Sequence, residues 1–337
     1  AKRITDEAMG IEGLIRQTGV HACATIMGSE PITNTSPLLE RTDGTVTTTL
    51  EYHTCETLGL VKMDFLGLSN LTVIRDTLNN IEANGKERID HTKIPLDDRP
   101  TYDLLSRGDT LGVFQLDSDG MRSLLKTLKP NNFNDISALI ALYRPGPMDF
   151  IPQYIRGKNR PDTIKYDCPQ LEPILKPTYG CIVYQEQVMQ IVRDLAGYSY
   201  GQSDNVRRAM SKKKAKEMER NRNIFIYGDE SENIEGCIKR GIPEETASKI
   251  YADMTDFAKY AFNKSHAAAY AVVSYQTAYL KYYYPKEFMA ALLTSVMDNT
   301  GKITEYTMSC RQMGIQILPP DINEGEANFT PTEKGIR

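Results

Sequence analysis

The segment Val61-Lys62-Met63-Asp64-Phe65-Leu66 alternates between apolar and charged side chains, which is the pattern of a β-strand. Successive side chains of a strand point to opposite faces, so Val61, Met63 and Phe65 would face a core. Lys62 and Asp64 would lie side by side on the other face. A carboxylate in this position can hold Mg²⁺, and the adjacent ammonium can contact phosphate groups. The alternative is a solvated charged pair on an open strand face.

Two further strand candidates precede this segment. Residues 20–27 form a mostly apolar run that Gly28 ends, and residues 45–52 are rich in β-branched side chains. Residues 7–17 have the spacing of a short helix. The first quarter of the chain is therefore predicted to contain a small sheet layer.

The chain from residue 70 onward has mostly helical apolar spacing. Helices are predicted over residues 71–83, 102–106, 121–128, 135–142, 185–195 and 266–284. Residues 152–180 are rich in proline, glycine and charge, and are predicted to form a long loop. The fold class is therefore α+β, with a border between two units near residue 70.

The net charge of the chain conceals a strongly basic segment. The 337 residues include 40 basic and 44 acidic ones, a balance of −4 that argues against a general cationic coat for nucleic acid. Residues 205–222, however, contain eight Lys or Arg and two Glu, a local charge of +6. The rest of the chain carries −10. The overall charge therefore does not exclude a local basic face in this segment.

The basic segment is predicted to be a helix with Ser203 and Asp204 as candidate N-caps. Arg208 and Lys212 are four residues apart and share a helical face, and Arg207 lies beside them. Such a row suits a triphosphate or a nucleic-acid backbone, because Arg offers a planar fork and Lys a point charge. The alternative is a solvated, lysine-rich surface helix.

A second candidate anion site lies at the start of the helix predicted over residues 266–284. Ser265 is its expected N-cap, and the first turn of a helix exposes backbone N–H groups that attract anions. Lys264 and His266 would flank this turn. The alternative is a capped helix that packs through its alanines, with His266 in a local hydrogen bond.

Two further polar segments lie in predicted loops. Arg144 precedes Pro145-Gly146-Pro147, a stiff turn that would hold the arginine in a fixed orientation. The alternative is that this turn is only a rigid loop without a role in binding. Residues 184–187 (YQEQ) precede a helix and are interpreted as structural caps.

Several classes of protein are excluded by motifs that the sequence lacks. There is no GxxxxGK[ST], GxGxxG, GxSxG or HExxH pattern. The six cysteines are scattered without a CxxC pair, which argues against a zinc site and is typical of reduced thiols in a cytosolic protein. No apolar run approaches the ~20 residues that span a bilayer, and residues 1–13 have no apolar core of a signal peptide.

A series of motifs occurs along nearly the whole chain in a fixed order. The motifs are 60–68 (LVKMDFLGL), 112–116 (GVFQL), 144–147 (RPGP), 184–189 (YQEQVM), 207–210 (RRAM), 262–270 (FNKSHAAAY) and 319–323 (PPDIN). In identity and order they resemble those of the bacterial DNA polymerase III alpha subunits, the family C replicative polymerases.

The resemblance implies that the strand over residues 61–66 belongs to a palm of the nucleotidyltransferase fold. In that family three aspartates hold two Mg²⁺ ions that polarise the primer 3′-hydroxyl and stabilise the leaving pyrophosphate. Two of them form an Asp-x-Asp motif that this chain does not contain, and the third matches Asp64. Lys62 would contact the triphosphate. The two-metal site is therefore expected to be incomplete in this chain.

The resemblance also implies a mostly α-helical fingers domain after the palm. Its expected contacts with the incoming dNTP are Arg207, Arg208, Lys212 and Lys213. Its expected contacts with the nascent base pair and DNA are Asn263, Lys264, Ser265, His266, Tyr270 and Arg144.

By the same resemblance, residues 1–15 end an inserted thumb, 16–69 form the second palm segment and 70–310 the fingers. Residues 311–337 would lead toward a helix-hairpin-helix and clamp-binding region. The expected ligands are primer–template DNA and dNTP, and the expected location is the cytoplasm. A sliding clamp and other replisome subunits would bind through regions outside this chain. The chain would be an internal fragment that does not polymerise alone.

The main alternative is a non-enzymatic function. A helical scaffold could bind nucleic acid through the basic segment alone. Salt-sensitive DNA binding that is indifferent to dNTP would favour this scaffold, whereas metal-dependent dNTP binding would favour a polymerase.

Overall fold

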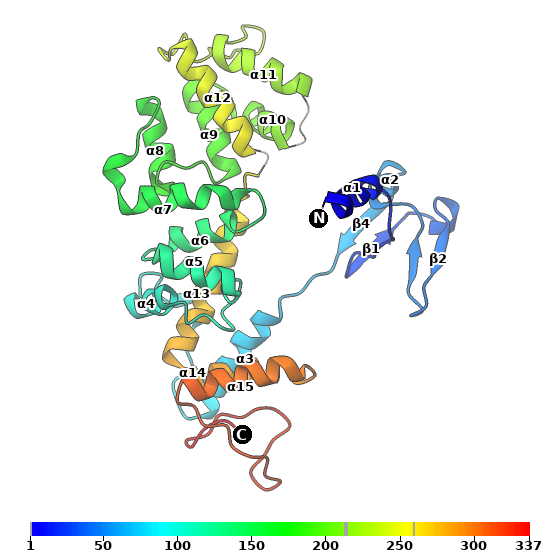
Figure 1. The fold of residues 1–337 in the computed structure, drawn as a ribbon, viewed down its shortest axis with the longest axis vertical. Coiled ribbons are helices and arrows are strands. Elements are labelled where there is room, and N and C mark those ends of the chain that lie inside the picture. Colours follow the sequence, from blue (N-terminus) through cyan, green and yellow to red (C-terminus); the bar gives the residue numbers. More distant parts are fainter. Residues whose placement is uncertain (1, 212–214, 259) are drawn as a thin grey trace. The chain divides into compact units, whose positions relative to one another are not determined.

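The chain divides into two compact units, Ala1–Leu68 and Ser69–Arg337, in a computed structural model that describes residues 2–211, 215–258 and 260–337 (Figure 1). The first unit contains four short strands and two helices, and the second is helical, so the predicted α+β class is confirmed. None of the helices in the described ranges is long and apolar enough to cross a membrane.

The first unit contains two separate two-stranded antiparallel sheets. Strand β1 (Ala24–Met27) pairs with β4 (Val61–Asp64), so that Ala24 lies opposite Asp64. Strand β2 (Leu38–Glu40) pairs with β3 (Val46–Thr48). Helix α1 (Lys2–Ile11) begins and ends about five residues before the predicted helix, and α2 (Tyr52–Thr57) was not predicted.

The predicted strand over residues 61–66 is found over Val61–Asp64, but the prediction that its apolar side faces a core is wrong for this unit. Val61, Met63 and Phe65 are 56%, 40% and 62% exposed. The reason is the position of α2, which packs against β4 on the other side. The ring of Tyr52 in α2 lies under the Lys62 ammonium, 5.2 Å from ring centroid to nitrogen, and the Lys62 side chain is only 17% exposed.

The second unit is a succession of helices joined by short turns. Its α-helices are α3 (Ser69–Ala83), α4 (Arg99–Arg107), α5 (Asp119–Leu128), α6 (Phe133–Leu142), α7 (Ile151–Asn159), α8 (Glu172–Leu175), α9 (Gln185–Ala196), α10 (Tyr200–Ser211), α11 (Ala215–Tyr227), α12 (Glu244–Ala258), α13 (Lys264–Tyr283), α14 (Pro285–Thr294) and α15 (Thr300–Gln312). Several begin at side-chain caps: Asp98, Ser118 and Asn132 accept hydrogen bonds from Thr101, Met121 and Asp135.

Residues 152–180 are not the predicted long loop. They contain most of α7, all of α8 and three short 3₁₀ turns, Pro161–Thr163, Pro169–Leu171 and Lys176–Thr178. Each of these elements has a proline at its first or second position. Proline is tolerated there because the N–H groups of a first turn have no partner within the helix.

Two predicted helix starts are displaced. Helix α10 begins at Tyr200, so Ser203 and Asp204 lie inside it and are not its caps. Ser199 and Gln202 cap it instead, since Gln202 N–H donates to Ser199 Oγ (3.3 Å) and Ser199 N–H to Gln202 Oε1 (2.8 Å). Ser265 is the second residue of α13, and the N-cap is Asn263, whose Oδ1 accepts from His266 N–H (2.8 Å).

Three hydrophobic cores lie in this unit. One surrounds α4, α5, α6 and α13, the second surrounds α9 to α12, and the third surrounds α3, α14 and α15. Helix α13 passes from the first core, through Ala267, Ala271 and Tyr275, into the third, through Leu280 (Figure 1). Helix α10 packs in the second core and the start of α13 in the first.

A buried polar cluster fixes α6 against α7. Asp135 is fully buried and accepts hydrogen bonds from Lys158 Nζ (2.5 Å), Tyr154 OH (3.2 Å) and Tyr179 OH (3.2 Å). The Lys158 side chain is itself buried. A buried charge is stable only when it is paired and hydrogen-bonded, and this carboxylate meets both conditions.

Candidate functional site

The charged pair on β4 lies in the first unit. Lys62 Nζ donates to both carboxylate oxygens of Asp64, at 2.8 and 3.0 Å. His21 Nδ1 lies 3.3 Å from Asp64 Oδ1. The hydrogen bond from Lys62 lowers the pKa of Asp64, so the carboxylate is ionised at neutral pH and can act as an anionic ligand.

The fit of this site to Mg²⁺ is partial. Asp64 is well exposed and offers a hard oxygen ligand of the kind that Mg²⁺ prefers. Among the residues that the structure describes, no group of three or more His, Cys, Asp or Glu side chains could hold a metal ion. The described residues therefore supply one carboxylate and do not by themselves form a metal site.

A second charged cluster lies on α10 in the helical unit. Asp204 Oδ1 accepts from Arg207 Nε (2.8 Å) and Nη2 (2.7 Å), and Asp204 Oδ2 lies 2.7 Å from Arg208 Nε. These two arginines lower the pKa of Asp204, with the hydrogen bond from Arg207 as the largest cause. One carboxylate thus holds both guanidinium groups next to each other. Lys212 and Lys213, predicted on the same row, lie outside the described residues.

The beginning of α9 connects this cluster to the beginning of α13. Gln185 Oε1 accepts from Arg207 Nη1 (3.2 Å), and Gln185 N–H donates to Phe262 O (2.9 Å). Phe262 N–H in turn donates to Val183 O (3.1 Å). The interpretation of residues 184–187 as structural caps is supported, because Gln187 Oε1 accepts from the N–H groups of Val183 and Tyr184.

The predicted anion site at the start of α13 is already filled by the protein itself. Lys264 N–H donates to both carboxylate oxygens of Glu186, at 3.0 and 2.9 Å. His266 lies between the rings of Phe262 and Tyr270, with centroid distances of 5.2 and 4.1 Å. A phosphate at this helix end would have to displace the Glu186 carboxylate or avoid it.

Arg144 reaches the same neighbourhood from the turn after α6. Its Nη2 donates to Tyr260 O (2.6 Å), its Nε donates to Ala141 O (2.9 Å), and its guanidinium lies over the Phe262 ring at 4.4 Å. Burial lowers the pKa of Arg144. The turn needs Gly146, which has φ 98°, because a Cβ there would lie 2.6 Å from the Tyr260 ring.

The structure therefore brings together the predicted residues of α10, of the 262–270 segment and of the 144–147 turn. Asp204, Gln185 and Glu186 also belong to this cluster but were interpreted from the sequence only as caps. A signal for Asp204 was present, since a carboxylate three and four residues before two arginines favours ion pairs on a helix. The contact of Glu186 with α13 has no comparable signal, because 78 residues separate the two partners.

Two family descriptions match the chain in the order of its units. Residues 1–67 match the bacterial DNA polymerase III alpha NTPase domain, and residues 70–233 match the bacterial DNA polymerase III alpha subunit finger domain.

Curated relatives named DNA polymerase III subunit alpha match nearly the whole chain. The chain is 49% identical over 342 residues to the protein of Saccharopolyspora erythraea, with 99% of the chain and 28% of the relative covered. It is 48% identical to the protein of Mycobacterium tuberculosis, with 100% and 28% covered. It is 44% identical to that of Thermus aquaticus, with 97% and 27% covered. The chain thus spans little more than a quarter of these relatives.

Proposed function

The chain belongs to the family of bacterial DNA polymerase III alpha subunits, and on this premise we propose that it forms part of a replicative DNA-directed DNA polymerase. The reaction is the template-directed addition of dNMP to a primer 3′-hydroxyl with release of pyrophosphate. Residues 16–69 would be a palm segment, 70–310 the fingers, 1–15 the end of a thumb, and 311–337 a link to later domains. Primer–template DNA and dNTP are the ligands, and the cytoplasm is the location.

The observation that carries this proposal is the pair of arginines on α10. Asp204 holds both guanidinium groups through Arg207 Nε and Nη2 and Arg208 Nε. Guanidinium forks bind phosphate oxygens in a bidentate manner, and the Arg208 side chain is 64% exposed. We assign the triphosphate of the incoming dNTP to Arg207 and Arg208, with Lys212 and Lys213 as further contacts.

The other predicted site residues of the helical unit lie at the start of α13 and in the turn after α6. His266 and Tyr270 form an aromatic row that can contact a nascent base pair, with Asn263, Lys264 and Ser265 at the helix start. Arg144 acts mainly by fixing the loop around Tyr260, since two of its nitrogens already donate to backbone carbonyls.

In the palm segment, Asp64 would bind Mg²⁺ as one of several carboxylates, and Lys62 would meet the triphosphate. Bound metal ions would supply Lewis-acid activation and charge stabilisation. The contribution of this chain is to keep Asp64 ionised and oriented through Lys62.

Arg208→Ala in the complete polymerase is expected to raise the apparent KM for dNTP about tenfold or more, because one charge-assisted contact to phosphate is lost, worth about 1.5–3 kcal/mol. Steady-state primer extension at varied dNTP concentration measures this. Arg222→Ala, which removes a cation from α11 in the same basic segment, is the matched control and should leave KM unchanged. An unchanged KM in the Arg208 variant would instead indicate a DNA-backbone or structural role.

The 337-residue chain alone is not expected to extend a primer, because its described residues supply a single carboxylate of the proposed metal site. A primer-extension assay with Mg²⁺ and all four dNTPs measures this. Mg²⁺-dependent extension that survives Asp64→Ala would contradict both the assignment of Asp64 and the incompleteness of the site. DNA binding that is salt-sensitive and indifferent to dNTP would favour the scaffold function.

A further inference from the structure

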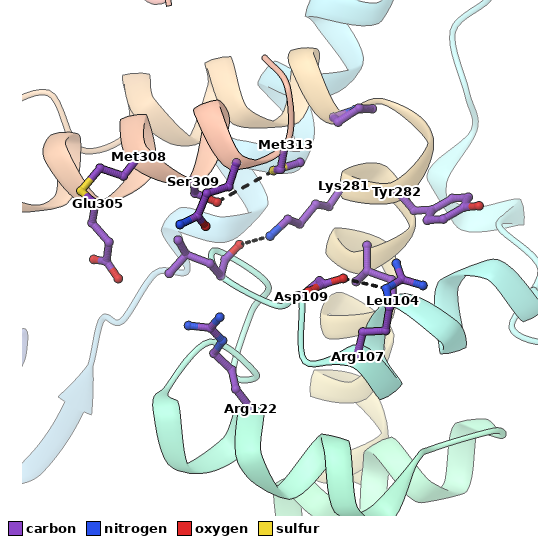
Figure 2. A pocket seen from close by; sticks show the side chains of 13 residues that line it. Leu104, Arg107, Asp109, Arg122, Lys281, Tyr282, Glu305, Met308, Ser309 and Met313 are labelled. Atoms are coloured by element: carbon purple, nitrogen blue, oxygen red, sulfur yellow. Dashed lines mark hydrogen bonds and ion pairs between the residues drawn. The ribbon is translucent and has the colours of Figure 1, made fainter. Parts of the chain in front are cut away.

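A pocket of about 610 Å³ lies within the helical unit, away from the residues assigned above (Figure 2). Helices α4, α5, α13 and α15, the first residue of α14 and the loop between α4 and α5 form its walls. Its volume falls in the range of ~300–1,000 Å³ that is typical of small-molecule sites. The pocket combines apolar side chains, such as Leu104, Met308 and Met313, with several charged ones.

The most unusual group in this pocket is the ammonium of Lys281. The residue is only 4% exposed, and its Nζ donates to Leu111 O at 2.7 Å (Figure 2). Within the described ranges, no carboxylate lies within ion-pair distance of this nitrogen. Burial lowers the pKa of Lys281 to about 8, while Asp109, Asp117 and Cys310 act to raise it and Arg122 to lower it. An ammonium has three donors, and a buried cation without a paired anion is unfavourable.

The other charged side chains that line the pocket balance one another, so Lys281 leaves the lining with one positive charge in excess. Asp109 is paired with Arg107 (2.7 Å), and Glu305 is paired with Lys302 (2.8 Å). Arg122 donates through Nε to Gly108 O (3.1 Å), and its Nη1 is 3.6 Å from the exposed Asp119. Both carboxylates that line the pocket are thus already paired with a cation, whereas Lys281 has no carboxylate partner among the residues that the structure describes.

We propose that this pocket binds a small organic phosphate, whose phosphate group contacts Lys281 and Arg122 and whose apolar part lies against Leu104, Met308 and Met313. The phosphate supplies the counter-charge that Lys281 lacks, and the guanidinium of Arg122 offers a fork for its oxygens. The proposal does not depend on the function proposed above.

Phenyl phosphate is a suitable probe, and isothermal titration of the whole chain measures its affinity. Arg122→Gln is expected to raise the Kd about tenfold, which corresponds to about 1.4 kcal/mol. Lys281→Met should abolish binding, with circular dichroism as the check that this variant folds. Phenol, which lacks the charge, should bind far more weakly than phenyl phosphate. Benzoate distinguishes a phosphate site from a general carboxylate site.

Two control variants test whether binding depends on this pocket and not on cations elsewhere in the chain. Arg88→Gln removes the same charge from an exposed arginine that pairs with Glu82 outside the pocket, and should leave the Kd unchanged. Arg208→Gln should also leave it unchanged, which distinguishes the pocket from the proposed triphosphate contacts. Equal affinity in wild type and Arg122→Gln, loss of binding in Arg208→Gln alone, or equal binding of phenol or benzoate would overturn the proposal.

Discussion

Asp64→Asn in the complete polymerase is expected to lower kcat for nucleotide addition by at least about 10²–10³-fold, the range for removing one group that stabilises charge in a transition state. The substitution keeps the size of the side chain and one oxygen but removes the negative charge that we assign to Mg²⁺ binding. Primer–template affinity should stay the same, because no DNA contact is assigned to Asp64. Single-turnover primer extension measures the chemical step directly.

The control for this variant lies in the same unit. Glu56→Gln neutralises an exposed carboxylate of α2 that lies 3.8 Å from His53 Nδ1, and the variant should extend primers at the wild-type rate. If Asp64→Asn were as active as Glu56→Gln, the pair on β4 would be a solvated surface ion pair. Unchanged far-UV circular dichroism would show that lost activity is not lost folding.

Asp135→Ala is expected to lower the free energy of unfolding of the helical unit by about 3–5 kcal/mol, the range for breaking a buried ion pair. The variant leaves the buried Lys158 ammonium and the hydroxyls of Tyr154 and Tyr179 without their shared acceptor. The chain has no tryptophan, so urea unfolding followed by far-UV circular dichroism is the appropriate measurement.

A double variant tests whether the loss of stability comes from the Lys158 ammonium that is left without its carboxylate partner. Lys158→Met removes that charge, so Asp135→Ala with Lys158→Met should be less destabilised than the sum of the two single variants. Strict additivity, or a loss below about 1 kcal/mol for Asp135→Ala, would show that the cluster contributes little to stability.

The sequence predicted best those helices whose signals are local. Helix α9 was predicted over 185–195 and is found over Gln185–Ala196, because regular apolar spacing ends at Gly197, which takes the left-handed conformation. The prolines were misleading. Those within residues 152–180 were taken to indicate a loop, but each of them lies in the first turn of a short helical element.

The orientation of β4 could not be predicted, because it depends on which side a separate helix covers. The alternation of residues 61–65 correctly placed Lys62 and Asp64 side by side. The side that α2 packs against is decided by contacts such as that of Tyr52 with Lys62, ten residues away. A two-residue period states which side chains share a face, but not which face is buried.

In the candidate site of the helical unit, too, local signals were predicted from the sequence and contacts between distant segments were not. The arginines of α10 were evident from charge alone, and their carboxylate partner was three and four residues away. The start of α13 was displaced by two residues, which turned Ser265 from a cap into a helical residue. Contacts between α9 and α13 arise only when the chain folds. The contact of Glu186 with the first turn of α13 could therefore not be predicted from the sequence.

Helix α13 has a consequence for how the helical unit opens. It has 20 residues and is therefore about 30 Å long, and it supplies side chains to two of the three cores. Local fluctuations that expose one core leave the helix held by the other, so its amide hydrogens should exchange with solvent only through concerted opening of both. The helix that carries the aromatic row at its start is thus expected to belong to the slowest-exchanging part of the unit.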